Sequence, residues 1–217
     1  MNIIAHRCNN YDYFEHSLDS CQRCLDDKNI DGLEIDVRLC KDNVLVVSHD
    51  NFVKTYKGKI INIKKTKYNN LKKYNIGDSI NVVRIRRLDD YLSKFKTNKK
   101  IIIEIKDDDK RVVDILYSVI NKYELNYYIC SFNYDIVSLF KKRYPKYKVG
   151  LFIGYMLNYD KFYNELDFNL LHYNLLNRIN LNKEVFIWTV NNKKIYDKIC
   201  KISENINIIS DKPYLFY

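Results

Sequence analysis

Short runs of β-branched and aromatic residues alternate along the chain with segments whose apolar residues recur at helical spacing. The runs have about the length of ordinary strands, and several are apolar at nearly every position. Helical spacing occurs between them, as in the segments SLDSCQRCLDDK and KRVVDILYSVINKYE. We predict nine strands, at residues 2–6, 32–38, 44–49, 100–106, 127–132, 148–153, 167–173, 184–190 and 205–210.

This alternation predicts βαβ units and a parallel sheet that is covered by helices. About eight such units, without a G-x-G-x-x-G turn, favour a closed (β/α)8 TIM barrel of the α/β class over an open dinucleotide-binding sheet. The sixth unit is irregular, because only the short polar piece NRINLNK separates FNLLHYNLL from VFIWTV. At 217 residues the chain suits a single domain, residues 1–217.

Composition argues against several classes of protein. No stretch approaches the roughly 20 apolar residues of a membrane span, and the apolar run that begins at residue 2 leaves no room for a charged leader, so we expect a cytoplasmic protein. The six cysteines lack the spacing of a disulfide framework and indicate reduced thiols. Although the net charge is +10, the lysines are scattered and only KIINIKKTKYNNLKKYN is densely basic, so we predict no nucleic-acid partner.

Charged side chains follow or interrupt several of the predicted strands. In a TIM barrel the chemistry lies at the carboxyl ends of the strands. The first strand ends in His6-Arg7, and the hairpin-like strand after the second one ends in His49. Glu34 and Asp36 lie two apart in GLEIDVRL and therefore project to the same face. Charges inside apolar strands are costly unless they are paired or bind a cation, so this grouping predicts a site.

A third carboxylate joins the set on the strand IIIEIKDDD, where Glu104 and Lys106 share one face. Three converging carboxylates repel one another and push one pKa upward. One divalent cation, Mg2+ or Ca2+, resolves this conflict, because both ions prefer oxygen ligands. The carboxylates contribute −3, the cation +2, and Arg7 with Lys106 +2. The sum of +1 is the charge that one monoanionic phosphodiester neutralises.

The two histidines at the strand ends supply the missing proton chemistry. One of His6 and His49 can take a proton from the attacking oxygen while the other donates one to the leaving alkoxide. The sequence does not show which histidine is the acid and which is the base.

Three further polar residues have simpler explanations. His172, in NLLHYNLL, fits a hydrogen-bonded strand residue without an acidic partner nearby in sequence. His16 lies at a helix start, and we expect it to be solvated. Asp211 follows the last strand and fits a residue of the turn there. Closure places that strand beside the first one, so a bond between Asp211 and Arg7 is the alternative.

The ordered set IAHR, EHS, GLEIDV, VVSHD, IEIK, IWTVN and ISDKP closely resembles the glycerophosphodiester phosphodiesterase family, from about residue 2 to residue 213. The resemblance implies a TIM barrel that hydrolyses a glycerophosphodiester to an alcohol and glycerol phosphate with the help of a metal ion. It also implies the following roles: His6 and His49 as the acid/base pair, Arg7 as the phosphate clamp, Glu34, Asp36 and Glu104 as metal ligands, Lys106 beside the phosphate, and Trp188 as an apolar wall of the alcohol pocket.

Two departures from the family pattern stand next to the site. Cys8 replaces the usual glycine after His-Arg, and His16 replaces the asparagine of Glu-Asn-Ser/Thr. Because cysteine resists a positive φ, we expect the turn at Cys8 to differ. Three alternatives stay open: lysophospholipase D-type hydrolysis of a lipid substrate with peripheral membrane contact, an inactive phosphate-binding barrel, and a basic nucleic-acid-binding protein. The oligomeric state also stays open.

Overall fold

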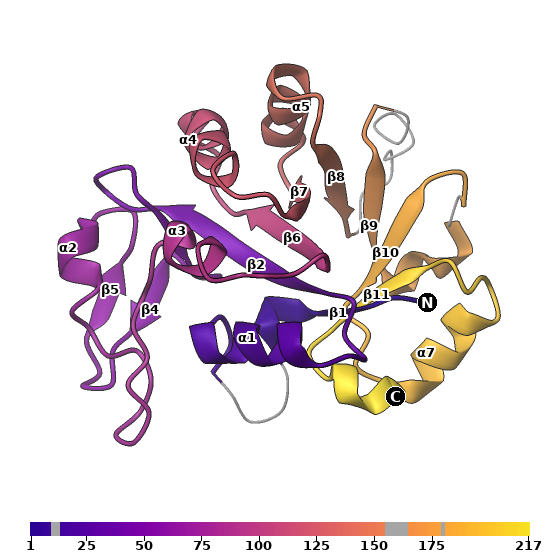
Figure 1. Ribbon diagram of the computed structural model, residues 1–217, viewed down its shortest axis with the longest axis horizontal. Coiled ribbons are helices and arrows are strands. Elements are labelled where there is room, and N and C mark those ends of the chain that lie inside the picture. Colours follow the sequence, from indigo (N-terminus) through magenta and orange to yellow (C-terminus); the bar gives the residue numbers. More distant parts are fainter. Residues whose placement is uncertain (10–13, 155–164, 179–180) are drawn as a thin grey trace.

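Eight parallel strands close into a barrel in the computed structural model, which describes residues 1–9, 14–154, 165–178 and 181–217 (Figure 1). Strand β1 pairs with β2 on one side and with β11 on the other, and this double pairing closes the sheet. The predicted TIM barrel is confirmed. Its strands are β1 (Ile3–Ala5), β2 (Gly32–Leu39), β6 (Lys100–Ile105), β7 (Asn126–Ser131), β8 (Lys148–Ile153), β9 (Phe168–His172), β10 (Glu184–Trp188) and β11 (Asn207–Ser210).

All nine predicted strands are present, with ends that lie within two residues of the prediction. The ninth is β3 (Leu45–Val47), which extends the sheet by pairing antiparallel with β2. Two further strands, β4 (Phe52–Lys54) and β5 (Ile60–Asn62), form a separate antiparallel pair that the sequence analysis missed.

Helices surround the barrel because each has one apolar face. In α4 (Arg111–Ile120), for example, Val112, Leu116 and Ile120 are buried at helical spacing. The other α-helices of this layer are α1 (Leu18–Asp26), α3 (Leu88–Leu92), α5 (Tyr134–Arg143) and α7 (Lys193–Cys200). Between β9 and β10 the described residues form only the short 3-10 helix η2 (Tyr173–Arg178), so the irregular sixth unit is confirmed. No helix in the described part of the chain is long and apolar enough to cross a membrane.

Strand alternation divides the core into two layers. On β6, Ile101 and Ile103 face the helices, whereas Ile102 points into the barrel. The buried apolar residues inside the barrel are Ile4, Ile102, Tyr128, Cys130, Phe152, Phe168, Leu170, Phe186 and Ile209. Glu104 continues the inward row of Ile102 toward the carboxyl end of its strand. The same period that builds the core therefore aims the charged side chains into the barrel mouth.

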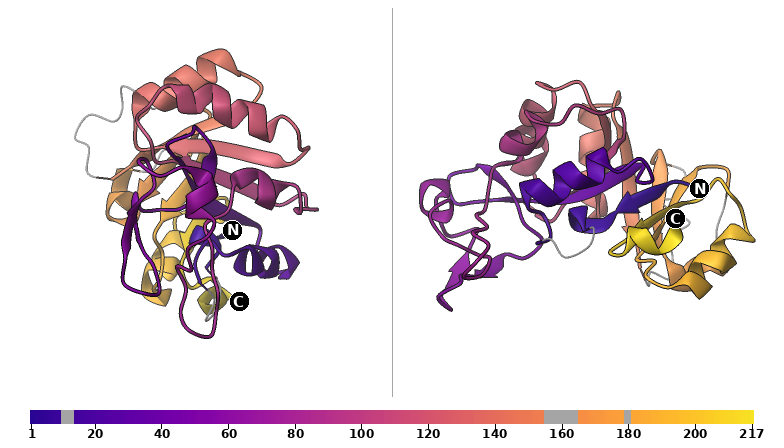
Figure 2. Two further views of the ribbon diagram at one scale, coloured as in Figure 1. Left: turned by 90° about the vertical axis from the view of Figure 1, so that its left-hand side faces the viewer. Right: turned by 60° about the horizontal axis from the view of Figure 1, so that its bottom comes forward.

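Residues 52–87, which we call the lobe, leave the barrel between β3 and α3 (Figures 1 and 2). The lobe contains β4, β5 and the single-turn helix α2 (Tyr68–Leu71). Its buried apolar residues form a small cluster with two residues of the β2–β3 hairpin: Cys40, Val46, Ile61, Ile63, Leu71 and Ile85. In Figure 1 the lobe lies at one end of the molecule and α7 lies at the other. That the chain is one domain stays a prediction.

Candidate active site

Three carboxylates meet inside the mouth of the barrel. Glu34 and Asp36 point inward from β2, and Asp36 lies in register with Glu104 on the neighbouring strand β6. One oxygen atom from each carboxylate lies within 4.8 Å of the other two. All three residues are buried, at 0%, 1% and 4% exposure respectively. The structure thus brings together the three carboxylates that were predicted from sequence as metal ligands.

The three carboxylates of this cluster differ in pKa: the two glutamates are raised and Asp36 is lowered. Burial, reinforced by the charges of Asp36 and Glu104, raises the pKa of Glu34 well above its usual range. Burial and the charge of Asp36 raise the pKa of Glu104 to about 8. Burial opposes the ionisation of Asp36 as well, but the hydrogen bond and charge of His16, with help from Lys106, lower the pKa of Asp36. Without a cation, the cluster therefore retains protons at neutral pH.

The donor atoms of the cluster fit a hard divalent cation. Oε1 of Glu34 and Oδ1 of Asp36 are buried and accept no hydrogen bond from the described residues. Buried acceptors without a partner are costly, and oxygen atoms are the ligands that Mg2+ and Ca2+ prefer. A bound cation would satisfy both atoms and relieve the repulsion that raises the two glutamate pKa values.

The first strand ends in a tight 3-10 turn, η1 (His6–Cys8), that is bonded to this cluster. The backbone N–H of Arg7 donates to Oε2 of Glu34 at 2.8 Å. Nε2 of His6 lies 3.9 Å from the same oxygen atom. Arg7 adopts a positive φ of 52°. This conformation aims the amide at Glu34 and places His6 beside the carboxylates.

Asp211 bonds to His6, and not to Arg7, which was the alternative from sequence. Oδ1 of Asp211 accepts a hydrogen bond from Nδ1 of His6 at 2.6 Å. Asn191 donates to the other oxygen of Asp211 at 2.6 Å and accepts the backbone N–H of Asp211 at 2.9 Å. Burial acts to raise the pKa of Asp211, but the hydrogen bond and charge of His6 lower it, and the pKa of Asp211 is lowered overall. The prediction that the last strand lies beside the first is confirmed. The side chain of the first strand end that reaches Asp211 is His6.

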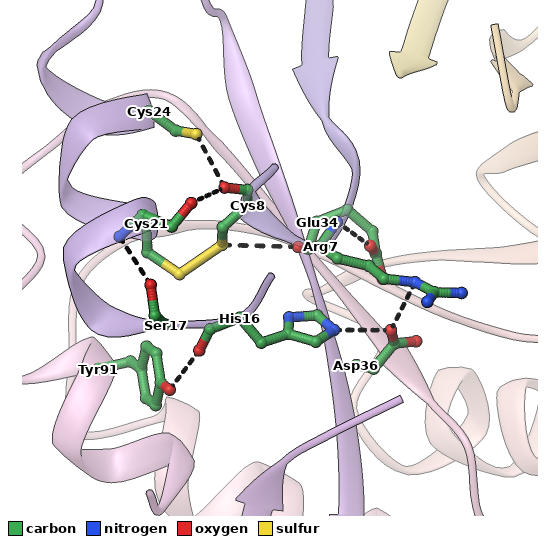
Figure 3. The surroundings of a disulfide bond; sticks show 10 residues. Arg7, Cys8, His16, Ser17, Cys21, Cys24, Glu34, Asp36 and Tyr91 are labelled. Atoms are coloured by element: carbon green, nitrogen blue, oxygen red, sulfur yellow. Dashed lines mark hydrogen bonds and ion pairs between the residues drawn. A yellow bond between two sulfur atoms is a disulfide. The ribbon is translucent and has the colours of Figure 1, made fainter. Parts of the chain in front are cut away.

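The side chain of Arg7 spans the edge of the cluster. Its Nη1 lies 3.2 Å from Glu15. Its Nε lies 3.7 Å from Asp36 (Figure 3). The Nε atom is buried without a hydrogen-bond partner among the described residues. Although burial opposes the charge, Glu15 and Asp36 raise the pKa of Arg7. The guanidinium is therefore a fixed cation with unused donor capacity beside the carboxylates.

His49 reaches the site from the segment after β3. Its Nδ1 contacts Oδ1 of the exposed Asp50 at 2.8 Å, and its backbone carbonyl accepts Nε of Arg38 at 2.8 Å. Burial lowers the pKa of His49, Lys106 and Arg7 lower it further, and Asp36 acts in the opposite sense. His49 is therefore an imidazole that is neutral at neutral pH.

His16 is buried, so the prediction that it is solvated was wrong. Its Nε2 donates to Oδ2 of Asp36 at 2.8 Å, and its backbone carbonyl accepts the hydroxyl of Tyr91 at 2.6 Å (Figure 3). A positive φ of 55° turns the residue toward the barrel. Its position in the motif EHS was the signal that it belongs to the site.

Cys8 and Cys21 form a disulfide, so the prediction of six reduced thiols was wrong for this pair. The bond joins η1 to α1, the helix whose amino terminus is capped by Ser17 (Figure 3). Cys8 has a φ of 54°, the conformation that glycine favours, so the expected change of turn was also wrong. The free cysteines are Cys24, Cys40, Cys130 and Cys200. A cytoplasmic location stays a prediction.

Lys106 completes the charged part of the site. Its Nζ lies 2.7 Å from Glu104 and 3.5 Å from Asp36. Burial acts to lower the pKa of Lys106, but these two carboxylates raise it. The pKa of Lys106 is raised overall, so the ammonium stays charged. The same nitrogen lies 5.7 Å from the ring centroid of Phe132, which is half exposed at the end of β7.

Trp188 lies in an aromatic group at the ends of β7, β8, β9 and β10. Its ring meets Phe132 and Phe152 edge-on, each at a centroid distance of 5.3 Å. Its Nε1 donates to the carbonyl of Leu170 at 3.0 Å, which fixes the indole. His172 lies against the same ring at 5.1 Å and accepts the N–H of Asn174, which agrees with its predicted role as a hydrogen-bonded strand residue.

Two hollows adjoin the charged cluster. The first, of about 370 Å³, is mostly polar, and Glu104, Lys106 and Phe132 line it. The second, of about 390 Å³, lies between His49 and the lobe. Its apolar lining residues are Phe14, Val47, Phe52, Val53, Ile76, Val83 and Ile85. The first hollow therefore opens onto Glu104 of the cluster, and the second lies beside His16 and His49.

A closed barrel with carboxylates and histidines at its strand ends is an arrangement that many hydrolases share. Comparison with known proteins identifies the family. The family model of the glycerophosphoryl diester phosphodiesterase family matches residues 6–215. Among curated proteins, none matches the chain. The chain belongs to the glycerophosphoryl diester phosphodiesterase family and is a phosphoric diester hydrolase.

Solved structures share this fold. A glycerophosphodiester phosphodiesterase from Thermotoga maritima is similar at 25% identity and a TM-score of 0.79, covering 99% of this chain and 96% of that one. One from Parabacteroides distasonis has 24% identity and a TM-score of 0.81, covering 99% and 94%. A phosphodiesterase from Oleispira antarctica, solved with the product sn-glycerol-3-phosphate, has 20% identity and a TM-score of 0.84, covering 98% and 94%.

Proposed function

We propose that this enzyme hydrolyses glycerophosphodiesters to an alcohol and glycerol phosphate, with one divalent cation and two histidines. The observation that carries the proposal is the convergence of Glu34, Asp36 and Glu104 beside His6 in one barrel mouth. The Oleispira antarctica structure, with sn-glycerol-3-phosphate as its product, supports the same substrate class for this chain.

Glu34, Asp36 and Glu104 would hold the cation, Mg2+ or Ca2+. When bound, it would withdraw electron density from the phosphate and offset the negative charge that develops during displacement. Nε2 of His16 donates to Oδ2 of Asp36, which leaves Oδ1 of that carboxylate as the buried acceptor without a hydrogen bond. His16 thereby orients this ligand.

Arg7 and Lys106 bind the phosphate. The guanidinium can donate two parallel hydrogen bonds to phosphate oxygens, whereas the ammonium acts as a compact point charge. Both side chains form ion pairs with carboxylates next to them, Arg7 with Glu15 and Lys106 with Glu104. They therefore present their charge without having to be ordered when substrate arrives.

His49 is the general base and His6 the general acid in this scheme. His49 has a lowered pKa and is neutral at neutral pH, so it can accept the proton of the attacking oxygen. The carboxylate of Asp211 at Nδ1 stabilises a positive charge on His6 and fixes the ring. His6 can then donate the Nε2 proton to the leaving alkoxide.

Trp188 forms an apolar wall for the alcohol or glycerol part of the substrate. The indole is fixed by its hydrogen bond to the carbonyl of Leu170 and packs edge-on against Phe132, which lines the polar hollow. Flat, rigid rings cover the carbon skeleton of a polyol or amino alcohol while the charged cluster engages the phosphate.

A turnover screen tests the proposal. Purified protein is assayed against a panel of glycerophosphodiesters that differ in their alcohol, with Mg2+, with Ca2+ and with EDTA. We expect metal-dependent release of glycerol phosphate that EDTA abolishes and that Glu34→Gln lacks, while the exposed Glu124→Gln serves as the matched control. Full activity in EDTA would remove the cation from the mechanism.

Lysophospholipids are a second candidate substrate class, favoured by the hollow beside His49. Five of its lining residues are aliphatic and two are phenylalanines, a surface that suits an acyl chain better than a polar head group. The same screen includes a lysophospholipid. A Val83→Asp variant, which places a charge in this hollow, is expected to lower turnover of the lipid and to spare the water-soluble substrates.

A further inference from the structure

The excess positive charge of the protein is concentrated in the lobe, which contains the densely basic stretch KIINIKKTKYNNLKKYN. Residues 52–87 contain eight lysines and three arginines against one aspartate, a net charge of +10. The other 181 residues contain 26 basic and 26 acidic side chains and are therefore neutral overall. All eleven cations are exposed, and only Lys64 and Arg87 form an ion pair with a described carboxylate.

The lobe also carries the most exposed large apolar side chains of the described residues. Ile80 is 87% exposed, Ile60 67%, Phe52 61%, Val82 57% and Tyr56 52%. Scattered apolar residues are common on protein surfaces, but here the five highest values fall within 31 consecutive residues. Exposed apolar surface of this extent beside a cluster of charges is typical of an interaction site.

Local structure explains why these side chains point outward. Lys54 on β4 lies in register with Ile60 on β5, and Phe52 shares their face because strand residues alternate. The opposite face packs Val53 and Ile61 into the small cluster of the lobe. The pair thus has one buried face and one face that presents isoleucine and phenylalanine beside lysine.

A second projection lies next to this face. The loop 76–83 is closed by backbone hydrogen bonds from Ile76 to Val83 and from Asp78 to Asn81, and its tip carries Ile80 and Val82. A hydrogen bond from the N–H of Tyr56 to the carbonyl of Asn75 ties this loop to the turn after β4. Figure 2 shows both projections extending from the barrel.

We propose that the lobe docks the enzyme on an anionic lipid surface. Lysine and arginine are drawn to acidic head groups, and side chains such as Ile60, Ile80 and Val82 can enter the boundary between head groups and acyl chains. Nucleic acid would use the same positive charge, but isoleucine and valine neither stack on bases nor pair with phosphates. The aliphatic tips therefore distinguish the two partners.

Docking in this way places lipid next to the barrel mouth. The hollow beside His49 is shared with Phe52, Val53 and Arg84 of the lobe, so the docking surface and the candidate site are continuous. The inference concerns the lobe alone and stands whichever phosphodiester the site cleaves, because binding to a lipid surface is measured without turnover.

Vesicle sedimentation with the full chain tests the proposal. Vesicles of phosphatidylcholine are compared with vesicles that contain about 30 mol% phosphatidylserine, at about 0.1 M and about 0.5 M salt. We expect binding only to the anionic vesicles, weakened at least about tenfold by the higher salt. I60S/I80S/V82S and K57E/K59E/K73E should each weaken it at least about tenfold. The matched controls, L181S/I202S/L215S and K194E/K198E/K201E, should bind as the unaltered chain does.

Thermal unfolding shows that every variant is folded, and the lobe variants should also retain hydrolysis of a water-soluble glycerophosphodiester. A failed turnover screen with intact vesicle binding would contradict the proposed function and leave the docking surface standing. Docking is overturned if the unaltered chain ignores anionic vesicles, or if the lobe variants and their controls bind equally. Salt-sensitive binding of a DNA or RNA duplex, without vesicle binding, would assign the lobe to nucleic acid instead.

Discussion

Asp211, which follows the last strand of the barrel, accepts a hydrogen bond at 2.6 Å from Nδ1 of His6, which follows the first. The contact spans 205 positions of sequence and exists because β11 and β1 are neighbours in the closed sheet. It fixes the ring through one nitrogen and leaves Nε2 free to face the carboxylates. His6 is therefore positioned by barrel closure.

Replacing Asp211 by Asn should lower kcat/KM about 10- to 100-fold, mainly through kcat, because the carboxylate that stabilises a protonated His6 is lost. The measurement is kcat/KM on a substrate with a poor leaving group and on a nitrophenyl ester, whose hydrolysis should be affected much less. Asp197→Asn, on the exposed face of α7, is the matched control. An equal loss on both substrates in Asp211→Asn would show that the contact is only structural.

His6 and His49 should act as one unit, so their losses should not add. Each alanine variant should lose about 10²- to 10⁴-fold on a substrate with a poor leaving group, and the double variant should resemble the worse single one. The unaltered enzyme should give a bell-shaped pH profile. A nitrophenyl ester, which needs little protonation, should rescue His6→Ala and not His49→Ala; the reverse pattern would exchange the two roles.

The cation-free protein should lose stability as the pH rises from about 6.5 to about 8. Glu104, with a pKa of about 8, keeps a proton in the folded state that the unfolded chain releases above about pH 4.5. The folded state thus binds more protons, and stability falls with pH. The lowered pKa of His49 acts in the opposite sense, but only below about pH 6.5.

Thermal unfolding in EDTA measures this effect. Glu104→Gln should flatten the pH dependence, and Glu124→Gln should leave it unchanged. Added Mg2+ or Ca2+ should raise the melting temperature most at the alkaline end, because cation binding displaces the retained protons. A melting temperature that rises between pH 6.5 and 8 in EDTA would contradict the proton-retaining cluster.

Arg7→Lys should lower kcat/KM at least about tenfold, which corresponds to about 1.4 kcal/mol of transition-state stabilisation. The charge is conserved, but the parallel donors of the guanidinium are lost. Steady-state kinetics on a water-soluble substrate measures the effect, and Arg111→Lys at the exposed start of α4 is the control. Equal kinetics for both variants would remove Arg7 from the phosphate-binding role.

Titration of the denatured, unreduced protein with a thiol reagent should count four thiols, because Cys8 and Cys21 are joined. Reduction should raise the count to six. The Cys8→Ser/Cys21→Ser variant should lose about 3 kcal/mol of unfolding free energy, the loss expected for a loop of about 15 residues. Six thiols before reduction would restore the prediction of free cysteines.

Periodicity in the sequence determined the barrel and the direction of its charged side chains. Residues two apart on a strand share a face whatever the strand packs against, so Glu34 with Asp36 and Glu104 with Lys106 were predicted as pairs. Strand ends meet at one end of a barrel, so His6 could be grouped with them from sequence alone.

Contacts that depend on which atoms meet were decided only by the tertiary structure. Closure put β11 beside β1, but side-chain reach decided that Asp211 bonds His6 and not Arg7. A positive φ turned His16 inward onto Asp36, although helix starts are usually solvated. Folding likewise brought Cys8 within bonding distance of Cys21. The charge of the lobe is present in the sequence, but only folding shows that its aliphatic residues share an exposed surface with those cations, because burial depends on packing between distant segments.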